Sequence, residues 1–217
     1  VGNGDVGRIS VIVSLWRSKS AAISMVFIAV LAVIGLLAPV IAPKDPTEIE
    51  IFREVNGVTI NPPFPPSGQN WFGTDQLGRD IFSRVLYAIR TSLVIGLLVR
   101  GGVMIVGVCL GLIAGYLPGI VAKATMRLTD VMLAFPALII AMAVTAILGP
   151  SLSTVIIALV LVGWPDVTRL VYGQTLGIRA SDYVVAARAL GANNFRIIAR
   201  HILPNIASPI IVAFSMG

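Results

Sequence analysis

Residues 21–42 read AAISMVFIAVLAVIGLLAPVIA, a run of 22 residues without one charged side chain. A helix needs about 20 mostly apolar residues to cross the hydrocarbon core of a bilayer. The run is too long for the apolar core of a signal peptide, which has roughly 7–15 residues. It therefore predicts a membrane-spanning helix, which we expect to end near Pro39 and Pro43.

The composition of the whole chain agrees with a membrane protein. Of its 217 residues, 57% are hydrophobic and 12% are charged, and the mean hydropathy is +0.94. Soluble domains carry about 25% charged residues, so this composition argues against a soluble enzyme and against a disordered chain. A disulfide scaffold is excluded because Cys109 is the one cysteine.

Further apolar runs predict an all-α polytopic membrane protein. Residues 92–117, interrupted only by Arg100, predict a second span. Residues 131–148 predict a third span and residues 152–168 a fourth, and a fifth begins over residues 205–217. We thus expect four complete spans and the start of a fifth.

The basic residues indicate the orientation of the spans. Ten of the 16 Lys and Arg residues lie in three segments, 1–20, 118–130 and 169–204. These segments alternate with the spans onto one side, which the positive-inside rule makes the cytoplasm. The net charge of +6 is therefore explained by topology, and we expect no nucleic-acid partner. Residues 43–91 would lie outside, where a helix capped by Asp80 would begin at Ile81, pair Asp80 with Arg84, and run into the second span.

The cytoplasmic segment 169–204 predicts a helix–turn–helix. Ser181 is a good N-cap, Gly191 is a natural stop after a helix over residues 183–190, and Asn193 or Asn194 can cap a second helix over residues 195–203. Pro204 would lie in the first turn of the next span. On these features alone, binding to anionic membrane lipid and docking to a partner protein are about equally favoured.

The same segment resembles the EAA loop of ABC-importer membrane subunits. The matching positions are Ala186-Ala187, three residues, Gly191, nine residues, then His201-x-Leu203-Pro204. Val185 departs from the Glu that the family usually has, and His201 from its Ile. The resemblance implies that this loop couples the chain to an ATPase subunit, through the residues Val185, Ala186, Ala187, Arg188, Leu190, Gly191, Phe195, His201, Leu203 and Pro204.

A second stretch, residues 72–84, resembles the external signature of the C-type dipeptide/oligopeptide/nickel permease. The resemblance implies the type I importer fold, which has six spans, so we expect the chain to be truncated from six. It also places a group of residues on the side of the external binding protein: Gly73, Thr74, Asp75, Gly78, Arg79, Asp80 and Arg84.

The resemblance implies a non-catalytic permease subunit of an ATP-driven importer of dipeptides or oligopeptides. It implies as partners a second homologous permease subunit, two ATPase subunits and an extracytoplasmic substrate-binding protein. No P-loop motif and no metal-ligand spacing occur in the sequence, so we expect no cofactor here and place ATP and Mg in the ATPase subunits. Nickel or glutathione import remains an alternative, as does an ion-coupled secondary transporter or channel.

The polar and small residues within the spans carry separate predictions. Arg100 either lines the translocation path or lies where the span has not yet begun. Two ion pairs are expected within single helices, Arg127 with Asp130 and Asp166 with Arg169. A third pattern, Gly at positions 107, 111 and 115, indicates close helix packing rather than substrate contact.

Overall fold

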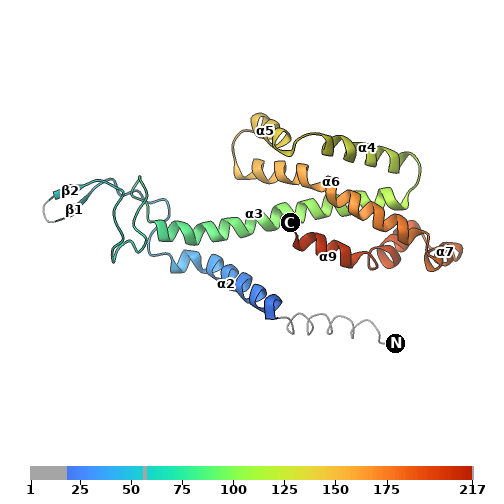
Figure 1. Ribbon diagram of the computed structural model, residues 1–217, viewed down its shortest axis with the longest axis horizontal. Helices are drawn as coiled ribbons and strands as arrows, with labels where there is room; N and C mark the ends of the chain where they lie inside the picture. The colour runs from blue at the N-terminus through green and yellow to red at the C-terminus, as the bar shows by residue number, and fades with distance from the viewer. Residues whose placement is uncertain (1–18, 56–57, 217) are drawn as a thin grey trace. The chain divides into compact units, whose positions relative to one another are not determined.

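The computed structural model describes residues 19–55 and 58–216 (Figure 1). The predicted N-terminal cytoplasmic segment, residues 1–20, lies almost wholly outside the described residues. The chain divides into two units, residues 1–94 and 95–217, and each is described by itself.

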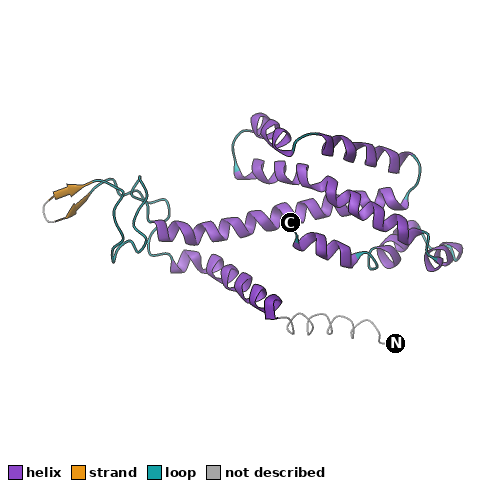
Figure 2. Cartoon of the chain, viewed as in Figure 1, coloured by secondary structure: helices purple, strands orange, loops and turns teal. Residues whose placement is uncertain are grey.

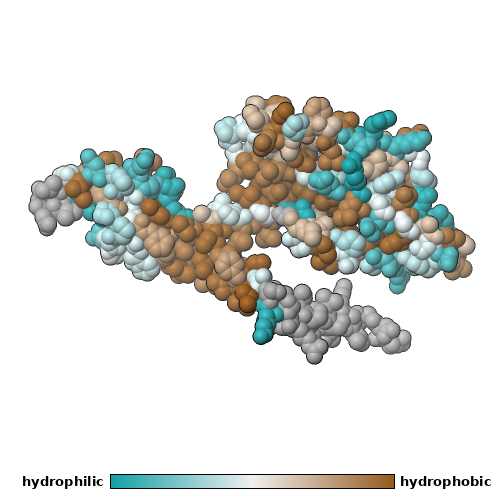
Figure 3. Space-filling view, in the orientation of Figure 1, coloured by the Kyte–Doolittle hydropathy of each residue, from teal (hydrophilic) through white to brown (hydrophobic). Residues whose placement is uncertain are grey.

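Unit 1 contains one apolar helix, an external segment and the start of a long helix. Helix α2 (Lys19–Ile41) covers the predicted first span, with Pro39 in its last turn. Strands β1 (Arg53–Val55) and β2 (Val58–Ile60) form an antiparallel hairpin in which Arg53 is opposite Ile60. In the described part of the chain this hairpin is the only sheet (Figure 2). In Figure 3 hydrophobic side chains run along α2, and hydrophilic ones cover the segment that follows it.

Helix α3 (Ile81–Tyr116) has 36 residues, 14 in unit 1 and 22 in unit 2. At 1.5 Å per residue it is about 54 Å long, well beyond the roughly 30 Å of a hydrocarbon core. The prediction that the helix after Asp80 runs into the second span is confirmed. Arg100 is the twentieth of its 36 residues, so the helix has begun long before it.

Unit 2 continues with six further helical segments. Their bounds are α4 (Ile120–Ala134), α5 (Ala137–Leu148), α6 (Leu152–Arg179), α7 (Asp182–Ala189), α8 (Asn194–Ile197) and α9 (Ala207–Ser215). A π-helical turn, η1 (Ile198–Ile202), follows α8 directly. Helices α4 and α5 both pack along α6 (Figure 1).

The predicted third span, residues 131–148, is not one helix. The chain bends by 93° between α4 and α5, and the predicted loop over residues 118–130 is largely the helix α4. Pro136 has no N–H to continue the ladder, and the residue before a proline is driven out of the helical region. Phe135 accordingly has φ −91° and ψ 140°.

The predicted fourth span, residues 152–168, extends to Arg179 in the structure. Pro165 lies inside α6 without ending it, and the first residues of the predicted cytoplasmic loop are helical. Among the described residues three helices, α2, α3 and α6, are long and apolar enough to cross a membrane. The number rises to five if each bent pair, α4–α5 and Asn194–Ile202 with α9, forms one span.

The interface between α3 and α6 depends on the three glycines at positions 107, 111 and 115. A Cβ on Gly107 would lie 2.6 Å from the Val167 side chain, and one on Gly111 would lie 2.6 Å from that of Val171. A Cβ on Gly115 would meet Thr175 at the same distance. Since real carbons do not approach so closely, glycine is required at these positions, and the prediction of close packing is confirmed.

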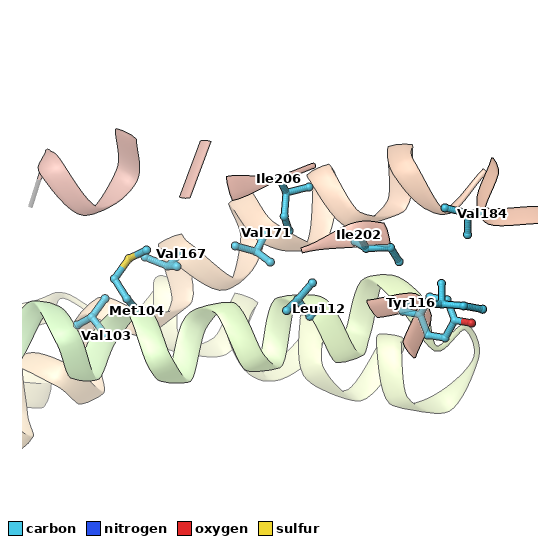
Figure 4. Close-up of a cluster of buried hydrophobic side chains, with 10 residues drawn as sticks. Val103, Met104, Leu112, Tyr116, Val167, Val171, Val184, Ile202 and Ile206 are labelled. Carbon is cyan, nitrogen blue, oxygen red and sulfur yellow. The ribbon is translucent and has the colours of Figure 1, made fainter. Parts of the chain in front are cut away.

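A cluster of buried side chains continues from this interface toward α7 (Figure 4). Val103, Met104 and Leu112 of α3 pack with Val167 and Val171 of α6. Further members come from the segments that follow α6: Val184, Ile197, Ile202 and Ile206. The cluster therefore joins the membrane helices of unit 2 to the predicted coupling segment.

Candidate coupling loop and external segment

The predicted helix–turn–helix is present, and we call residues 181–203 the coupling loop. Helix α7 ends at Ala189, and Gly191 two residues later has φ +80°. The Gly191 N–H donates to the Arg188 carbonyl at 3.0 Å, and the Ala192 N–H donates to the Ala187 carbonyl at 3.1 Å. These two bonds form a Schellman motif, which requires the left-handed conformation that glycine adopts without strain.

The caps of the two helices differ from each other. Asn193 caps α8, since its Oδ1 accepts the Arg196 N–H at 2.8 Å, as predicted for Asn193 or Asn194. Ser181 occupies the N-cap position of α7, but its side chain does not cap the helix. Its hydroxyl instead donates to the Ile178 carbonyl at 2.6 Å, because the last turn of α6 lies within reach.

The second helix of the loop is irregular. After α8 the chain forms the π-helical turn η1, in which the Leu203 N–H donates to the Ile198 carbonyl at 2.8 Å. Pro204 does not lie in the first turn of the next helix, because α9 begins only at Ala207. Pro204 has no backbone N–H and cannot donate a hydrogen bond to a carbonyl of the preceding turn. The side-chain amide of the next residue, Asn205, donates to the His201 carbonyl at 2.6 Å.

The coupling loop separates its apolar residues into a buried and an exposed set. Val184 and Ile197 have no exposed surface, since they pack in the cluster of unit 2. Leu190 is 88% exposed, Phe195 80% and Val185 54%. These three side chains project from the loop, so the loop has an apolar surface that nothing within the described residues covers.

The other predicted coupling residues differ in their exposure. Ala186, Arg188, Gly191, Leu203 and Pro204 are exposed. Ala187 and His201 are half-buried, and the His201 ring lies 6.5 Å from that of Tyr183. Nine of the ten predicted positions thus lie within the coupling loop, and the tenth, Pro204, directly follows it.

Two residues that were not predicted, Tyr116 and Arg179, attach the loop to the helix bundle. Tyr116, the last residue of α3, is 3% exposed, and its hydroxyl donates to Asn194 Oδ1 at 3.0 Å. Arg179 donates to the carbonyls of Gly115 and Tyr116 at 3.3 and 3.4 Å. The helix over residues 81–116 shows no pattern that singles out Tyr116, because its partner is 78 residues away.

Both predicted ion pairs within single helices are wrong. Arg169 of α6 instead pairs with Asp130 of α4, with 2.5 Å between Nη2 and Oδ1. The side chains are 54% and 56% exposed, so this pair links two packed helices at their surface. The local spacing of the sequence could not reveal a partner on another helix.

Arg100 has a protein partner in the structure. Its guanidinium donates to the carbonyls of Ala213 and Phe214 in the last turn of α9. A cation near the carbonyl end of a helix is favourably placed. Its role as a translocation-path residue stays a prediction.

In unit 1 the external signature surrounds a buried carboxylate. Asp80 is 2% exposed, and it accepts the Ser83 N–H at 2.8 Å, which confirms the predicted cap of α3. Its other oxygen accepts the Asn70 amide at 2.9 Å, and Asn70 in turn accepts from Arg53 at 2.7 Å. The predicted pair of Asp80 with Arg84 is wrong, because Asp80 faces these buried donors.

Arg84 pairs with Asp75, which also binds Arg79 at 2.8 Å. The Asp75 carboxylate further accepts the Leu77 and Arg79 backbone N–H groups at 2.9 and 3.0 Å. It therefore holds a tight turn, which passes through Gly78 at φ +78°. A Cβ at Gly78 would lie 2.0 Å from the Glu50 carbonyl oxygen.

Two more signature residues, Thr74 and Gly73, contact Phe64 in the preceding part of the external segment. Thr74 exchanges hydrogen bonds with Phe64, whose ring is buried beneath the Arg53 guanidinium. Gly73 has φ +72°, and a Cβ there would lie 2.6 Å from the Phe64 carbonyl oxygen. The seven signature residues thus make internal contacts, which explains their types, and a contact with a binding protein stays a prediction.

These contacts shift the acidity of the two carboxyls. Burial raises the pKa of Asp80, but the Ser83 N–H and the Asn70 amide outweigh it and hold that pKa below its usual value. Burial likewise raises the pKa of Asp75, and hydrogen bonds from Arg79 and Leu77 outweigh it. A carboxyl with a lowered pKa stabilises the fold above its unfolded pKa, and this contribution is lost as the pH falls through the folded value.

We therefore expect the external segment to keep its structure from pH 7 to about pH 5 and to loosen only below about pH 4. Trp71 reports on it, because its ring lies 4.9 Å from that of Phe82. The measurement is the fluorescence of Trp71 against pH in a chain with Trp16→Phe and Trp164→Phe. A transition centred above pH 6 would contradict the assignment, and Asp45→Asn serves as an exposed control.

The sequence matches two protein families. The family described as binding-protein-dependent transport system inner membrane component matches residues 107–216. The chain belongs to this family. The N-terminal transmembrane domain of oligopeptide transport permease C matches residues 10–71, which include α2 and the β hairpin.

Individual relatives are similar along most of the chain. A dipeptide transport system permease protein of Alkalihalophilus pseudofirmus is 39% identical over 94% of this chain and 64% of its own length. A glutathione transport system permease protein of Pectobacterium atrosepticum is 38% identical over 92% of this chain and 64% of its own. A putative peptide transport system permease protein of Brucella suis is 38% identical over 97% and 69%. The chain thus spans about two thirds of the length of these relatives.

Proposed function

We propose that this chain is the membrane permease subunit of an ATP-driven importer that brings dipeptides or oligopeptides into the cytoplasm. The observation that carries the proposal is the coupling loop, in which Val185, Leu190 and Phe195 are exposed while Val184 and Ile197 are buried. The names of the relatives support the substrate class, because several are dipeptide or peptide permeases.

The shape of the loop supports docking to a protein. Exposed apolar and aromatic side chains at the tip of a structured loop are typical of an interface that a partner desolvates. Arg188 and Arg196 beside them add positive charge, which favours an acidic rim on the partner. The partner that fits a loop on the predicted cytoplasmic side is an ATPase subunit.

The mechanism is alternating access. A binding protein delivers the peptide at the outer face, beside residues 43–80, and two ATPase subunits hold the coupling loops of this chain and of a homologous permease subunit. ATP shifts the equilibrium between inward-open and outward-open states only if it binds the two states with different affinity. This chain supplies the path and the loop, and we place ATP and Mg in the ATPase subunits.

The test is reconstitution of the full-length protein with its partner subunits in proteoliposomes. We expect uptake of a labelled dipeptide to require both internal ATP and the external binding protein. Uptake driven by a proton or sodium gradient without ATP would overturn the proposal and favour a secondary transporter. Competition by unlabelled glutathione or Ni²⁺ separates the alternative substrates, and glutathione is favoured among them by the 38% identical glutathione permease.

The exposed aromatic residue of the loop gives a specific prediction. Phe195→Asp is expected to weaken binding of the ATPase subunits by about 30-fold or more, because a buried aromatic anchor contributes 2 kcal/mol or more. The control is Phe52→Asp in the external segment, where the side chain is 65% exposed. Co-purification with increasing ATPase concentration measures both variants, and equal affinity for the two would contradict the docking surface.

A further inference from the structure

Tyr116 joins the end of α3 to the coupling loop. It is the last residue of the helix, its side chain is 3% exposed, and its hydroxyl lies 3.0 Å from Asn194 Oδ1. Asn194 is the first residue of α8, and the neighbouring Asn193 caps that helix. The hydrogen bond therefore connects the end of α3 to the start of α8.

Two arginines complete this joint. The Arg188 guanidinium of α7 lies 5.3 Å from the centre of the Tyr116 ring, a cation–π contact. Arg179, the last residue of α6, donates to the carbonyls of Gly115 and Tyr116. Three segments, α6, α7 and α8, thus meet α3 at a single residue.

The hydroxyl and the ring of Tyr116 make different kinds of contact. Apolar contacts such as those of Leu112 and Ile202 in the same cluster are non-directional. A hydrogen bond is directional and depends steeply on distance. The bond to Asn194 therefore adds a directional contact between α8 and the end of α3 to the apolar packing of Ile197 in the same cluster.

We propose that the Tyr116 hydroxyl, through its hydrogen bond to Asn194, transmits movement of the coupling loop to α3. Tyr116 is a positioning residue in this scheme, since it touches neither nucleotide nor peptide. The inference rests on the proposed function, because it assigns a residue to the step between ATP hydrolysis and opening of the path. Without the hydroxyl, the Arg179 and Arg188 contacts remain, and only part of the loop's movement is passed to α3.

Cys109 offers a probe of α3 itself. It is the one cysteine of the sequence, it lies on α3 seven residues before Tyr116, and it is exposed. A nitroxide label on Cys109 of the assembled importer, with cysteine-free partner subunits, reports movement of α3 when ATP is added. This readout does not depend on which substrate is transported.

The variants are Tyr116→Phe, Asn194→Ala and the double variant, and the control is Tyr172→Phe on α6. Tyr116→Phe keeps the ring and its contact with Arg188 and removes only the hydroxyl. We expect it to lower the peptide moved per ATP hydrolysed by about two- to tenfold, the size of one lost hydrogen bond. The ATP-dependent change at Cys109 should fall with it, while ATP hydrolysis and assembly continue.

The double variant distinguishes a link from general damage. If the hydroxyl and the Asn194 amide act through one bond, the double loss equals either single loss. Additive losses, or an unchanged Cys109 response in Tyr116→Phe, would overturn the inference. A normal ATP response at Cys109 without peptide uptake by the unmodified protein would overturn the proposed substrate and leave the link standing.

Discussion

Asp80→Ala is expected to destabilise the folded external segment by about 2–6 kcal/mol. The substitution leaves the Asn70 amide and the Ser83 N–H without their acceptor, and each unsatisfied buried donor costs about 1–3 kcal/mol. Both donors are inaccessible to water, since Asn70 and Ser83 have no exposed surface. The loss should also disorder the start of α3, because Asp80 caps it.

Hydrogen exchange of residues 61–84 in the purified protein at pH 7 measures this effect as the free energy of local opening. The control is Asp45→Ala, since Asp45 is an exposed carboxylate that accepts hydrogen bonds from Thr47, two residues along. Asp80→Asn keeps the shape but directs an amide donor at another donor, so we expect it to lie between the control and Asp80→Ala. Exchange equal to that of the control would show that the buried network does not hold the segment.

Gly111→Ala is expected to destabilise unit 2 by about 1–3 kcal/mol, the cost of forcing one methyl group into a packed interface. The added Cβ would lie 2.6 Å from the Val171 Cβ and 2.8 Å from the Thr168 carbonyl oxygen. Neither neighbour can turn away, because one is bonded directly to the backbone and the other belongs to it. The helices must separate, which also removes contacts of the buried cluster.

Gly101→Ala on the same helix is the matched control, and it should act in the opposite direction. A Cβ at Gly101 meets nothing within 4 Å. Alanine is favoured over glycine inside a helix by up to about 1 kcal/mol, so this variant should be equally or more stable. Thermal unfolding in nanodiscs compares the two, and a loss of stability in both would show that the effect does not come from the α3–α6 interface.

Local chemistry explains which features of the fold could be predicted. The apolar run at residues 21–42, the Gly191 stop, the Asn193 cap and the Asp80 cap are each decided by residues within a few positions of one another. The break at Phe135-Pro136 is also a local effect, since proline disfavours the helical conformation of the residue before it. It was not predicted, because the apolar residues on both sides were interpreted as one continuous span.

For the candidate sites, the positions along the chain were predicted and the internal side-chain partners were not. The spacing of Ala186, Gly191 and Pro204 predicted the position of the coupling loop. The signature over residues 72–84 predicted the position of the external segment. Their internal partners were not predicted: Arg84 pairs with Asp75, Arg169 with Asp130, and Tyr116 with Asn194. Each local alternative had acceptable spacing, so only the packing of the segments decided between them.

Apolar runs, glycines and caps act over one or two helical turns, so local sequence is enough to identify a helical membrane protein with a coupling loop. Helix packing selects which charges meet, leaves no room for a side chain at the glycines of α3, and places Tyr116 against the loop. Those features depend on contacts between residues that lie from 9 to 78 positions apart, and these contacts form only when the segments pack. The physical reason is that side-chain partners are chosen by proximity in space, whereas propensity and capping are properties of neighbours along the chain.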